Sequence, residues 1–463
     1  MSRLRVRRGT KLVAAATAIS VAALTGCSSG SKTAGSSTTS AGAGSVATAG
    51  GGSSSGGITA SDIQWGASFL GQKAGAANPS LSPVAFGWVN AQGGTLSFPD
   101  NTSAMQAAVD FVNKDLGGIG GHPLVAHSCF GAVASDSLKC GEQMANDGAV
   151  KAVTSSEFEL DDQAFFNALG GKKPYLDGQL VYPVDYTTPN VYSYYQSVAD
   201  ASAQAIDAAQ QVLHAKRLIV IRTDNAPGLA AFQGLSAEAK LAGLNTVQVP
   251  VPEPGTDPQY TAALSAVNPG PGDVILLYIT AIGSTSVYDA MNSLNLTKIP
   301  VLGGGLQLLP PMPGHLQALG LKDTVFPTGW YFQDGGFSEL KPTSNSNGEN
   351  VYDATMQSYF PSANVHGAAP VAWGDTMMMA KLLIGAGGAA ATSNALSQEM
   401  KAYTGLAPLN AGNTNCGALP STPNACYFGA GLMQRLNGQW VSVADGYNGK
   451  ALDLLPVLQK ISG

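Results

Sequence analysis

From residue 58 to the end of the chain, short apolar runs rich in β-branched residues alternate with longer stretches in which apolar residues recur at helical spacing. This alternation is typical of α/β proteins, in which helices cover both faces of a mainly parallel sheet. In the first part of the chain the pattern predicts strands at residues 63–70, 123–126, 151–154 and 174–176, and helices at residues 102–116, 133–147 and 161–169.

A second series of the same kind begins with an Ala-rich helix predicted over residues 192–214. The Leu-Ile-Val-Ile run within residues 217–223 is continuous, as in strands that are buried on both faces. Further strands are predicted at residues 246–251, 273–279 and 299–303, and helices at residues 228–242, 258–267 and 286–294. The pattern therefore predicts a second α/β lobe.

The last part of the chain mixes helices with a hairpin. We expect a strand at residues 325–332 and helices at residues 348–360, 370–384 and 394–404. The run Met377-Met378-Met379 lies in an apolar helix and is interpreted as core. Asn437-Gly438 separates two short apolar runs, which is a strong signal for a β-hairpin. The order predicts two lobes and a return segment that ends with this hairpin.

The amino terminus has the pattern of an export signal. A basic start is followed by an apolar stretch at residues 12–24, about 13 residues long and too short for a membrane-spanning helix, which needs roughly 20. The sequence Leu-Thr-Gly-Cys that ends at Cys27 resembles the bacterial lipobox, whose cysteine is lipidated after cleavage. We therefore expect residues 1–26 to be a signal peptide and Cys27 to carry a lipid. An ordinary signal peptide with an incidental Cys27 is the alternative.

Residues 27–57 are expected to tether the folded part of the protein to the membrane. After the cysteine they are nearly all Ser, Gly, Thr and Ala, with one lysine as the only charge. Such a segment cannot bury enough apolar surface to offset the entropy lost on ordering. The sequence thus predicts a protein that is exported and lipid-anchored to the outer face of the cytoplasmic membrane.

Composition and charge argue against a nucleic-acid-binding protein. Of the 463 residues, 44% are hydrophobic and 12% are charged, compared with about a quarter charged in an average soluble domain. Removal of the predicted leader takes away five basic residues, which leaves 19 bases against 30 acids and a net charge of −11. Because such a surface repels phosphate backbones, we do not expect nucleic-acid binding.

Cysteine spacing agrees with an exported protein. Apart from the lipobox cysteine, Cys129 with Cys140 and Cys416 with Cys426 form two locally spaced pairs. Such pairs usually oxidise outside the cytoplasm. The separations differ from the CxxC half of a zinc site, and no His-rich segment lies nearby. We expect two structural disulfides and no metal site.

Two passages carry a resemblance to a known family. Residues 107–124, Ala-Ala-Val-Asp-Phe-Val-Asn-Lys-Asp-Leu-Gly-Gly-Ile-Gly-Gly-His-Pro-Leu, resemble the first helix, double-Gly turn and second strand of type I periplasmic binding proteins. Residues 216–228, a buried strand ending in Asp224, resemble the first strand of that family's second lobe. From residue 58 onward, the chain is similar to the leucine/isoleucine/valine-binding-like receptors of ABC importers.

The resemblance implies an α/β fold with two doubly wound, Rossmann-like lobes joined by a three-stranded hinge. It places residues 58–183 and 331–429 in the first lobe, residues 184–330 in the second, and residues 430–463 near the hinge. It also implies a ligand cleft where the carboxyl ends of the strands meet, the position at which open parallel sheets bind ligands.

Candidate ligand-binding residues of the first lobe follow two predicted strands. Ser155 and Ser156 come after residues 151–154, where hydroxyl and backbone N–H groups can hold a carboxylate. The alternative is that they only cap their own helix. Asp177 and Gln179 follow the next strand, although Asp-Gly is also common as a plain turn.

The second lobe supplies further candidates. Asp224 and Asn225 end one strand, Tyr278 ends another, and Tyr195 begins the long predicted helix, where it could cover an apolar ligand or pack in the core. The aromatic-Gly pair common in the family is replaced by Ala-Pro-Gly at residues 226–228.

A second departure concerns the charge of the ligand. Residues 278–284 contain no acid, whereas amino-acid receptors of the family commonly place one there to pair with the ligand ammonium. Because a buried ammonium without a counter-charge is costly, either Asp224 or Asp177 supplies the charge, or the ligand is not an α-amino acid. Amino acids, amides and small organic acids all stay open as ligands.

No motif for catalysis stands out. The histidines form no HExxH pattern and no Gly-x-Ser-x-Gly elbow occurs. The acids Glu157, Glu159, Asp161 and Asp162 are interpreted as a solvated loop and helix start, where acids favour the helix dipole. We therefore expect no enzyme activity and no cofactor.

The hypothesis for function is an extracytoplasmic, monomeric receptor that delivers a small solute to an ABC permease. This function comes from the resemblance, because a fold alone does not define an activity. The alternative is an extracytoplasmic sensor that signals to a membrane partner.

Overall fold

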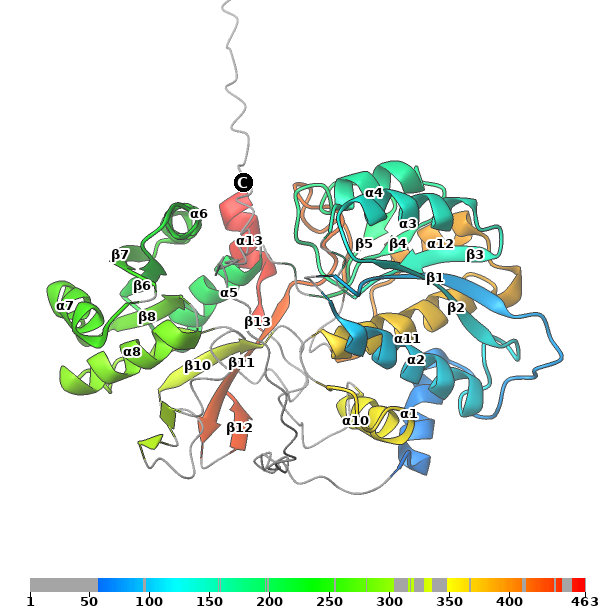
Figure 1. Cartoon of the computed structure of the whole chain (residues 1–463), viewed down its shortest axis with the longest axis horizontal. Helices are drawn as coiled ribbons and strands as arrows, with labels where there is room; N and C mark the ends of the chain where they lie inside the picture. The colour runs from blue at the N-terminus through cyan, green and yellow to red at the C-terminus, as the bar shows by residue number, and fades with distance from the viewer. Residues whose placement is uncertain are drawn as a thin grey trace, which may run out of the picture.

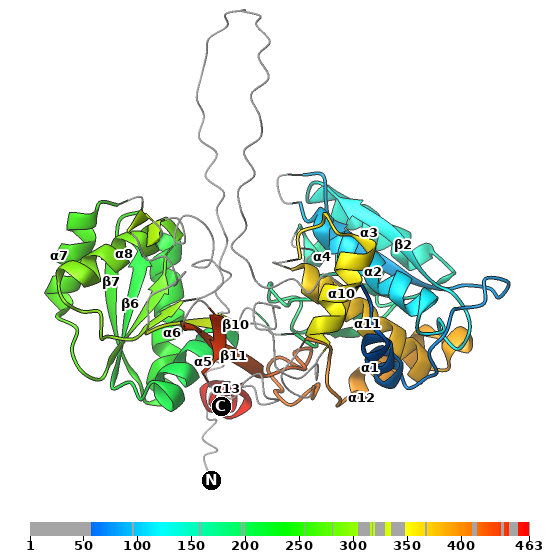
Figure 2. The same ribbon diagram turned by 90° about the horizontal axis from the view of Figure 1, so that it is seen from below.

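Two β-sheets, each flanked by helices, make up the described part of the protein (Figures 1 and 2). The computed structural model describes residues 57–94, 97–156, 158, 160–195, 197, 200–253, 255–279, 281–303, 315–316, 318–319, 329–334, 348–365, 368–409, 414–436, 439–443 and 452–462. The predicted signal peptide, Cys27 and all of the tether but its last residue lie outside these residues.

The first sheet is entirely parallel. Its strands lie in the order β2 (Leu124–Gly131), β1 (Val84–Ala91), β3 (Val150–Thr154), β4 (Tyr175–Leu176) and β5 (Val191–Tyr192). Side chains alternate between its two faces, as a strand requires. Phe86 and Trp88 belong to one core, and Val89 and Val153 belong to the other.

Helices cover both faces of this sheet (Figure 1). The core around Trp88 includes α2 (Pro99–Lys114) and α11 (Ala369–Gly385), whereas α3 (Ser135–Asn146) and α4 (Asp162–Leu169) cover the opposite face. Met377, Met378 and Met379 of α11 are fully buried, which confirms their interpretation as core residues.

The prediction of a strand at residues 63–70 is wrong, because this segment forms helix α1 (Ala60–Leu70). Its start is a capping box, in which the Asp62 backbone N–H donates to the Thr59 hydroxyl and the Thr59 N–H donates to the Asp62 carboxylate. The first strand among the described residues is instead β1, whose apolar run is interrupted by Gly87 and Asn90. A side chain at Gly87 would collide with Met144 of α3, so glycine permits this helix to pack closely.

The prediction of a helix over residues 192–214 places the start of the helix too early. Val191 and Tyr192 form β5, and α5 runs from Asp200 to Asp207, followed by a π-helical turn at Ala208–Val212. β5 pairs with β4, so the chain leaves the first sheet only after Tyr192. The lobe boundaries taken from the resemblance stay a prediction.

The second sheet confirms the strands predicted between residues 217 and 303. It has the order β7 (Asn245–Val251), β6 (Arg217–Thr223), β8 (Asp273–Tyr278), β9 (Val301–Gly303), β10 (Trp330–Asp334), β11 (Gly429–Leu436) and β12 (Gln439–Ser442). The strands from β7 to β10 are parallel, and β11 is antiparallel to β10. Residues 325–328 of the strand predicted before β10 lie outside the described residues.

Helices also cover both faces of the second sheet. Leu218 and Val220 of β6 share a core with α5, α6 (Ala226–Ala242) and α13 (Leu455–Ser462), and Ile219 and Ile221 pack with α7 (Asp257–Val267) and α8 (Ala281–Ser293). This strict alternation explains why the strand reads as a continuous apolar run, since both faces are buried.

Judged from the described helices and strands, the chain passes between the two sheets three times. The passages lie between β5 and α5, between β10 and α10 (Glu349–Tyr359), and between α12 (Ser393–Ala402) and β11. The antiparallel β11 and β12 confirm the predicted hairpin, although its turn at Asn437 and Gly438 lies outside the described residues. The short strand β13 (Leu452–Asp453) also pairs with β11, and it was not predicted.

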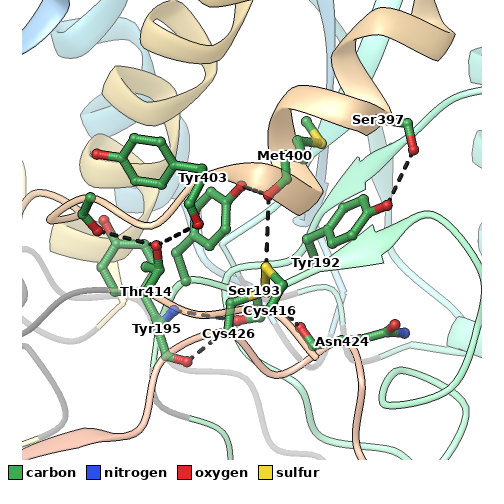
Figure 3. The surroundings of a disulfide bond; sticks show 12 residues. Tyr192, Ser193, Tyr195, Ser397, Met400, Tyr403, Thr414, Cys416, Asn424 and Cys426 are labelled. Carbon is green, nitrogen blue, oxygen red and sulfur yellow. Dashed lines mark hydrogen bonds between the residues drawn. A yellow bond between two sulfur atoms is a disulfide. The ribbon is translucent and has the colours of Figure 1, made fainter. Parts of the chain in front are cut away.

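Both disulfides predicted from the sequence form, joining Cys129 to Cys140 and Cys416 to Cys426. The loop of the second disulfide lies beside the segment that follows β5 (Figure 3). The Ser193 N–H donates to the Asn424 carbonyl, and the Cys426 N–H donates to the Ser193 carbonyl, both at 2.9 Å. This disulfide therefore lies where two of the passages between the sheets leave the first sheet.

Candidate functional site

Three segments meet beyond the carboxyl end of β3 in the first sheet: the loop after β3, the loop after β4, and the start of α11. The Ser156 hydroxyl donates to the Ala368 carbonyl at the start of α11, at 2.8 Å. A Cβ at Gly178, after β4, would overlap the Ser156 carbonyl, so only glycine allows the two loops to approach this closely. The site proposed from the sequence is therefore built from parts of the chain more than 200 residues apart.

The two predicted serines are fully buried within this arrangement. The Tyr175 hydroxyl donates to the Ser155 hydroxyl oxygen at 2.7 Å, which leaves the Ser155 proton available as a donor. The alternative that these serines cap their own helix is wrong, because the N-cap of α4 is Asp161, whose carboxylate accepts from the Ala164 N–H at 3.0 Å. Ligand binding by either serine stays a prediction.

Asp177 and Gln179 lie in the loop that follows β4. The Asp177 side chain is only 5% exposed, its backbone N–H donates to the Tyr192 carbonyl, and its carboxylate accepts from the Gln179 N–H at 3.3 Å. The Asp177 carboxylate therefore bonds to the backbone of its own loop, and ligand binding by Asp177 or Gln179 stays a prediction. Gly178 of the same loop packs against Ser156.

An acid that the sequence analysis missed lies next to this loop. Asp375 of α11 is fully buried, and neither of its carboxylate oxygens has a hydrogen-bond partner among the described residues. Burial, and secondly the charge of Asp177, raise the pKa of Asp375 well above its ordinary value. The available signal was that Asp375 is the only acid in α11, most of whose residues are apolar.

Tyr195 follows β5 instead of opening a helix, and it packs against the first sheet's helices. Its hydroxyl donates to the Pro408 carbonyl at 3.0 Å, and a Cβ at Gly374 of α11 would overlap that hydroxyl. Burial raises the pKa of the Tyr195 phenol well above its ordinary value, and the nearby Asp375 adds to this effect. Tyr194 is likewise buried, with its hydroxyl donating to the Met400 carbonyl at 2.6 Å.

In the second sheet, Asp224 and Asn225 lie together at the end of β6. The Asn225 side chain caps α6 by accepting from the Gly228 N–H at 2.8 Å. The Asp224 side chain is 65% exposed, and its carboxylate lies 3.7 Å from the buried Arg222 guanidinium. The Asp224 carboxylate is therefore accessible to solvent, whereas the Asn225 side chain is hydrogen-bonded to the start of its own helix.

Tyr278 points into the second lobe's own core. Its hydroxyl lies 3.4 Å from the Ser202 hydroxyl on α5, and burial raises the pKa of Tyr278 to about 12. The structure thus brings Ser155, Ser156, Asp177 and Gln179 together, and it places Tyr278 among helices of the other sheet.

The acids that follow β3 do not all face solvent. Asp161 is exposed and caps α4, and Asp162 lies in the first turn, so the predicted helix start is confirmed. Asp162 is buried, so its interpretation as a solvated residue is wrong, and Glu157 and Glu159 lie outside the described residues. Within the described ranges, no group of His, Cys, Asp and Glu side chains is arranged to hold a metal ion. No helix in the same ranges is both long enough and apolar enough to cross a membrane.

The sequence of this chain is similar to that of a known protein family. Residues 83–418 match the family described as periplasmic binding protein. A comparison with curated proteins gave no match.

Several solved structures have the same fold. An ABC transporter substrate-binding protein from Sphaerobacter thermophilus has a TM-score of 0.60 and 14% identity, covering 78% of this chain and 96% of that one. The branched-chain amino acid transporter substrate-binding protein of Streptococcus pneumoniae, in complex with isoleucine, has a TM-score of 0.53 and 16% identity. The match covers 78% of this chain and 100% of that one. A solute-binding protein from R. palustris, in complex with 4-hydroxybenzoate, has a TM-score of 0.55 and 14% identity. The match covers 80% of this chain and 96% of that one. The TM-scores establish a shared fold, and at identities this low the comparison shows the fold alone.

Proposed function

Because the chain belongs to the periplasmic binding protein family, whose sequence pattern covers residues 83–418, we propose that it is an extracytoplasmic receptor that binds a small solute and delivers it to an ABC importer. The family match is the observation that carries this proposal. The two α/β sheets with three connecting passages support it, since such pairs of lobes can close around a solute.

The loops beyond β3 and β4 are the proposed ligand site in the first lobe. Ligands of open parallel sheets bind outside the carboxyl ends of the strands, and Ser155, Ser156 and Asp177 lie at that edge. The exposed Asp224 at the carboxyl end of β6 is the proposed contact from the second lobe. The protein binds its solute without changing it, and its partner is the membrane permease.

Solutes of different chemistry bind to proteins of this fold. The Streptococcus pneumoniae protein is in complex with isoleucine, and the R. palustris protein is in complex with 4-hydroxybenzoate. The fold alone therefore allows both amino acids and aromatic acids as ligands of this chain.

A thermal-shift screen tests the receptor function. Amino acids, amines, amides, aromatic acids and polyols are added to the purified protein, and we expect at least one to raise the melting temperature, because a ligand that binds only the folded state stabilises it. Ser155→Ala should weaken the response, whereas Ser103→Ala, on the exposed side of α2, should not. If no solute in the panel raises the melting temperature, the receptor function is wrong.

We also propose that the protein is anchored through a lipid on Cys27. The lipobox-like sequence and the Ser/Gly-rich segment that follows it support this anchor. Cys27→Ala should release the protein from membranes and remove the lipid from the mass of the mature chain. Membrane retention of the Cys27→Ala protein at the wild-type level would contradict the anchor.

A further inference from the structure

The loop closed by the disulfide between Cys416 and Cys426 extends the first sheet beside β5 (Figure 3). Ala425 forms an isolated parallel bridge with Ser193, the residue that follows β5. The two hydrogen bonds of this bridge join the Ser193 backbone to Asn424 and Cys426. The passage from α12 to β11 therefore leaves the first sheet directly beside the passage from β5 to α5.

The side chain of Asn424 fixes the same loop to the chain that precedes β5. It is 6% exposed, and its amide nitrogen donates to the Asp185 carbonyl at 2.6 Å and to the Thr188 carbonyl at 2.8 Å. The described segment 414–426 contains neither a helix nor a strand. It therefore depends for its shape on the disulfide and on such contacts, because no regular ladder of backbone hydrogen bonds holds it.

Two tyrosines fix the beginning of the passage from β5 to the same part of the first lobe. The Tyr194 hydroxyl donates to the Met400 carbonyl of α12 at 2.6 Å. The Tyr195 hydroxyl donates to the Pro408 carbonyl, in the segment between α12 and the disulfide loop, at 3.0 Å. Both tyrosines are buried. On the side of the first sheet, the two passages are thus bonded to each other through backbone and side chains.

The two passages are joined again on the side of the second sheet. Only Tyr427 and Phe428 separate Cys426 from β11. The buried side chain of Gln204 on α5 donates to the Gly431 carbonyl of β11 at 2.8 Å. Residues 427–430 are therefore all that lies between the two fixed points in the passage from α12.

A fixed start for this short segment has a consequence for closure. Two lobes close around a solute by rotating about the segments that join them. With an unfixed disulfide loop, the passage could leave the first sheet in several directions, and only some of the resulting lobe orientations would lead to closure. The apparent affinity for a solute falls in proportion to the fraction of molecules that are competent to bind it.

We propose that the Cys416–Cys426 disulfide and Asn424 are positioning elements of the hinge. They fix the first-lobe end of the passage from α12 to β11, so that the empty receptor is held in orientations from which it can close. This inference rests on the proposed receptor function and adds a determinant of affinity that does not touch the solute.

Isothermal titration calorimetry tests the inference with the solute that gives the largest shift in the thermal-shift panel. The double replacement Cys416→Ser and Cys426→Ser should weaken its binding about tenfold, a factor equivalent to the ordering of about one backbone residue. Asn424→Ala keeps the disulfide and removes two hydrogen bonds, so it should weaken binding about threefold or more. This second variant decides the question if the double variant does not fold.

The other disulfide provides the matched control. The Cys129–Cys140 bond closes a loop of nearly the same length, with a sequence separation of 11 instead of 10, so its loss should destabilise the fold to a similar extent. It joins β2, the strand at the opposite edge of the first sheet from β5, to α3. Cys129→Ser with Cys140→Ser should therefore keep the wild-type affinity.

The comparison separates a role in the hinge from a role in folding alone. The inference is overturned, while the receptor function stands, if the two disulfide variants bind the solute equally tightly or if Asn424→Ala binds it like the wild type. If the wild-type protein binds no solute of the panel, the receptor function fails and the inference fails with it.

Discussion

Replacement of Asp375 with asparagine should stabilise the solute-free protein at neutral pH. In the folded protein, burial and then the charge of Asp177 raise the pKa of the Asp375 carboxyl well above its ordinary value of 3.8. In the unfolded chain the carboxyl ionises near that ordinary value. As the pH rises above it, the folded state must keep a proton that the unfolded state has released, so the wild-type protein loses stability.

The magnitude of the effect follows from the one proton involved. Between the unfolded and the folded pKa, this carboxyl should lower the free energy of unfolding by about 1.4 kcal/mol for each pH unit. An asparagine side chain has a similar shape and does not titrate, so the Asp375→Asn protein should lose this component. The stability difference between variant and wild type should therefore increase steadily with pH.

Urea unfolding of the solute-free proteins at pH 4, 5, 6 and 7 measures this difference. Asp224→Asn is the control, because the Asp224 side chain is 65% exposed. For that control we expect a nearly constant difference over the same range. A difference between Asp375→Asn and wild type that does not grow with pH would refute the assignment of Asp375 as a buried, protonated acid.

Two further predictions concern the covalent and steric constraints of the fold. Joint replacement of Cys416 and Cys426 with serine should lower the free energy of unfolding by about 3 kcal/mol, because the disulfide closes a loop ten residues long; unchanged urea midpoints would contradict this value. Gly178→Ala should lower the melting temperature and weaken solute binding, because its Cβ would overlap the Ser156 carbonyl, whereas Gly148→Ala, which has open space around it, should change neither; equal effects in calorimetry would show that the loop contact is unimportant.

Much of the fold could be predicted because burial on both faces leaves a clear trace in a sequence. The continuous apolar run of β6 gave its limits correctly, since helices cover both sides of this strand. At the start of the described residues, apolar content alone led to a wrong prediction, because residues 63–70 and β1 are both apolar. The capping residues Thr59 and Asp62 identify the helix, and Gly87 interrupts the apolar run of the strand.

The candidate site was predicted only in part, because its contacts join distant parts of the chain. Ser155, Ser156 and Asp177 follow strands and could be found by position alone. The packing of Ser156 on Ala368 spans 212 residues and leaves no local pattern. Asp375 could be noticed as an acid among apolar residues, but its burial depends on how α11 packs against the sheet and α2.

The most direct test of the receptor function is to determine the fate of a bound solute. The protein is saturated with the tightest binder from the thermal-shift panel, unbound solute is removed by dialysis, and the solute released on denaturation is identified by mass spectrometry. We expect one solute per chain, recovered chemically unchanged. Recovery of a converted product, or of no solute at all, would contradict a receptor that only binds and delivers.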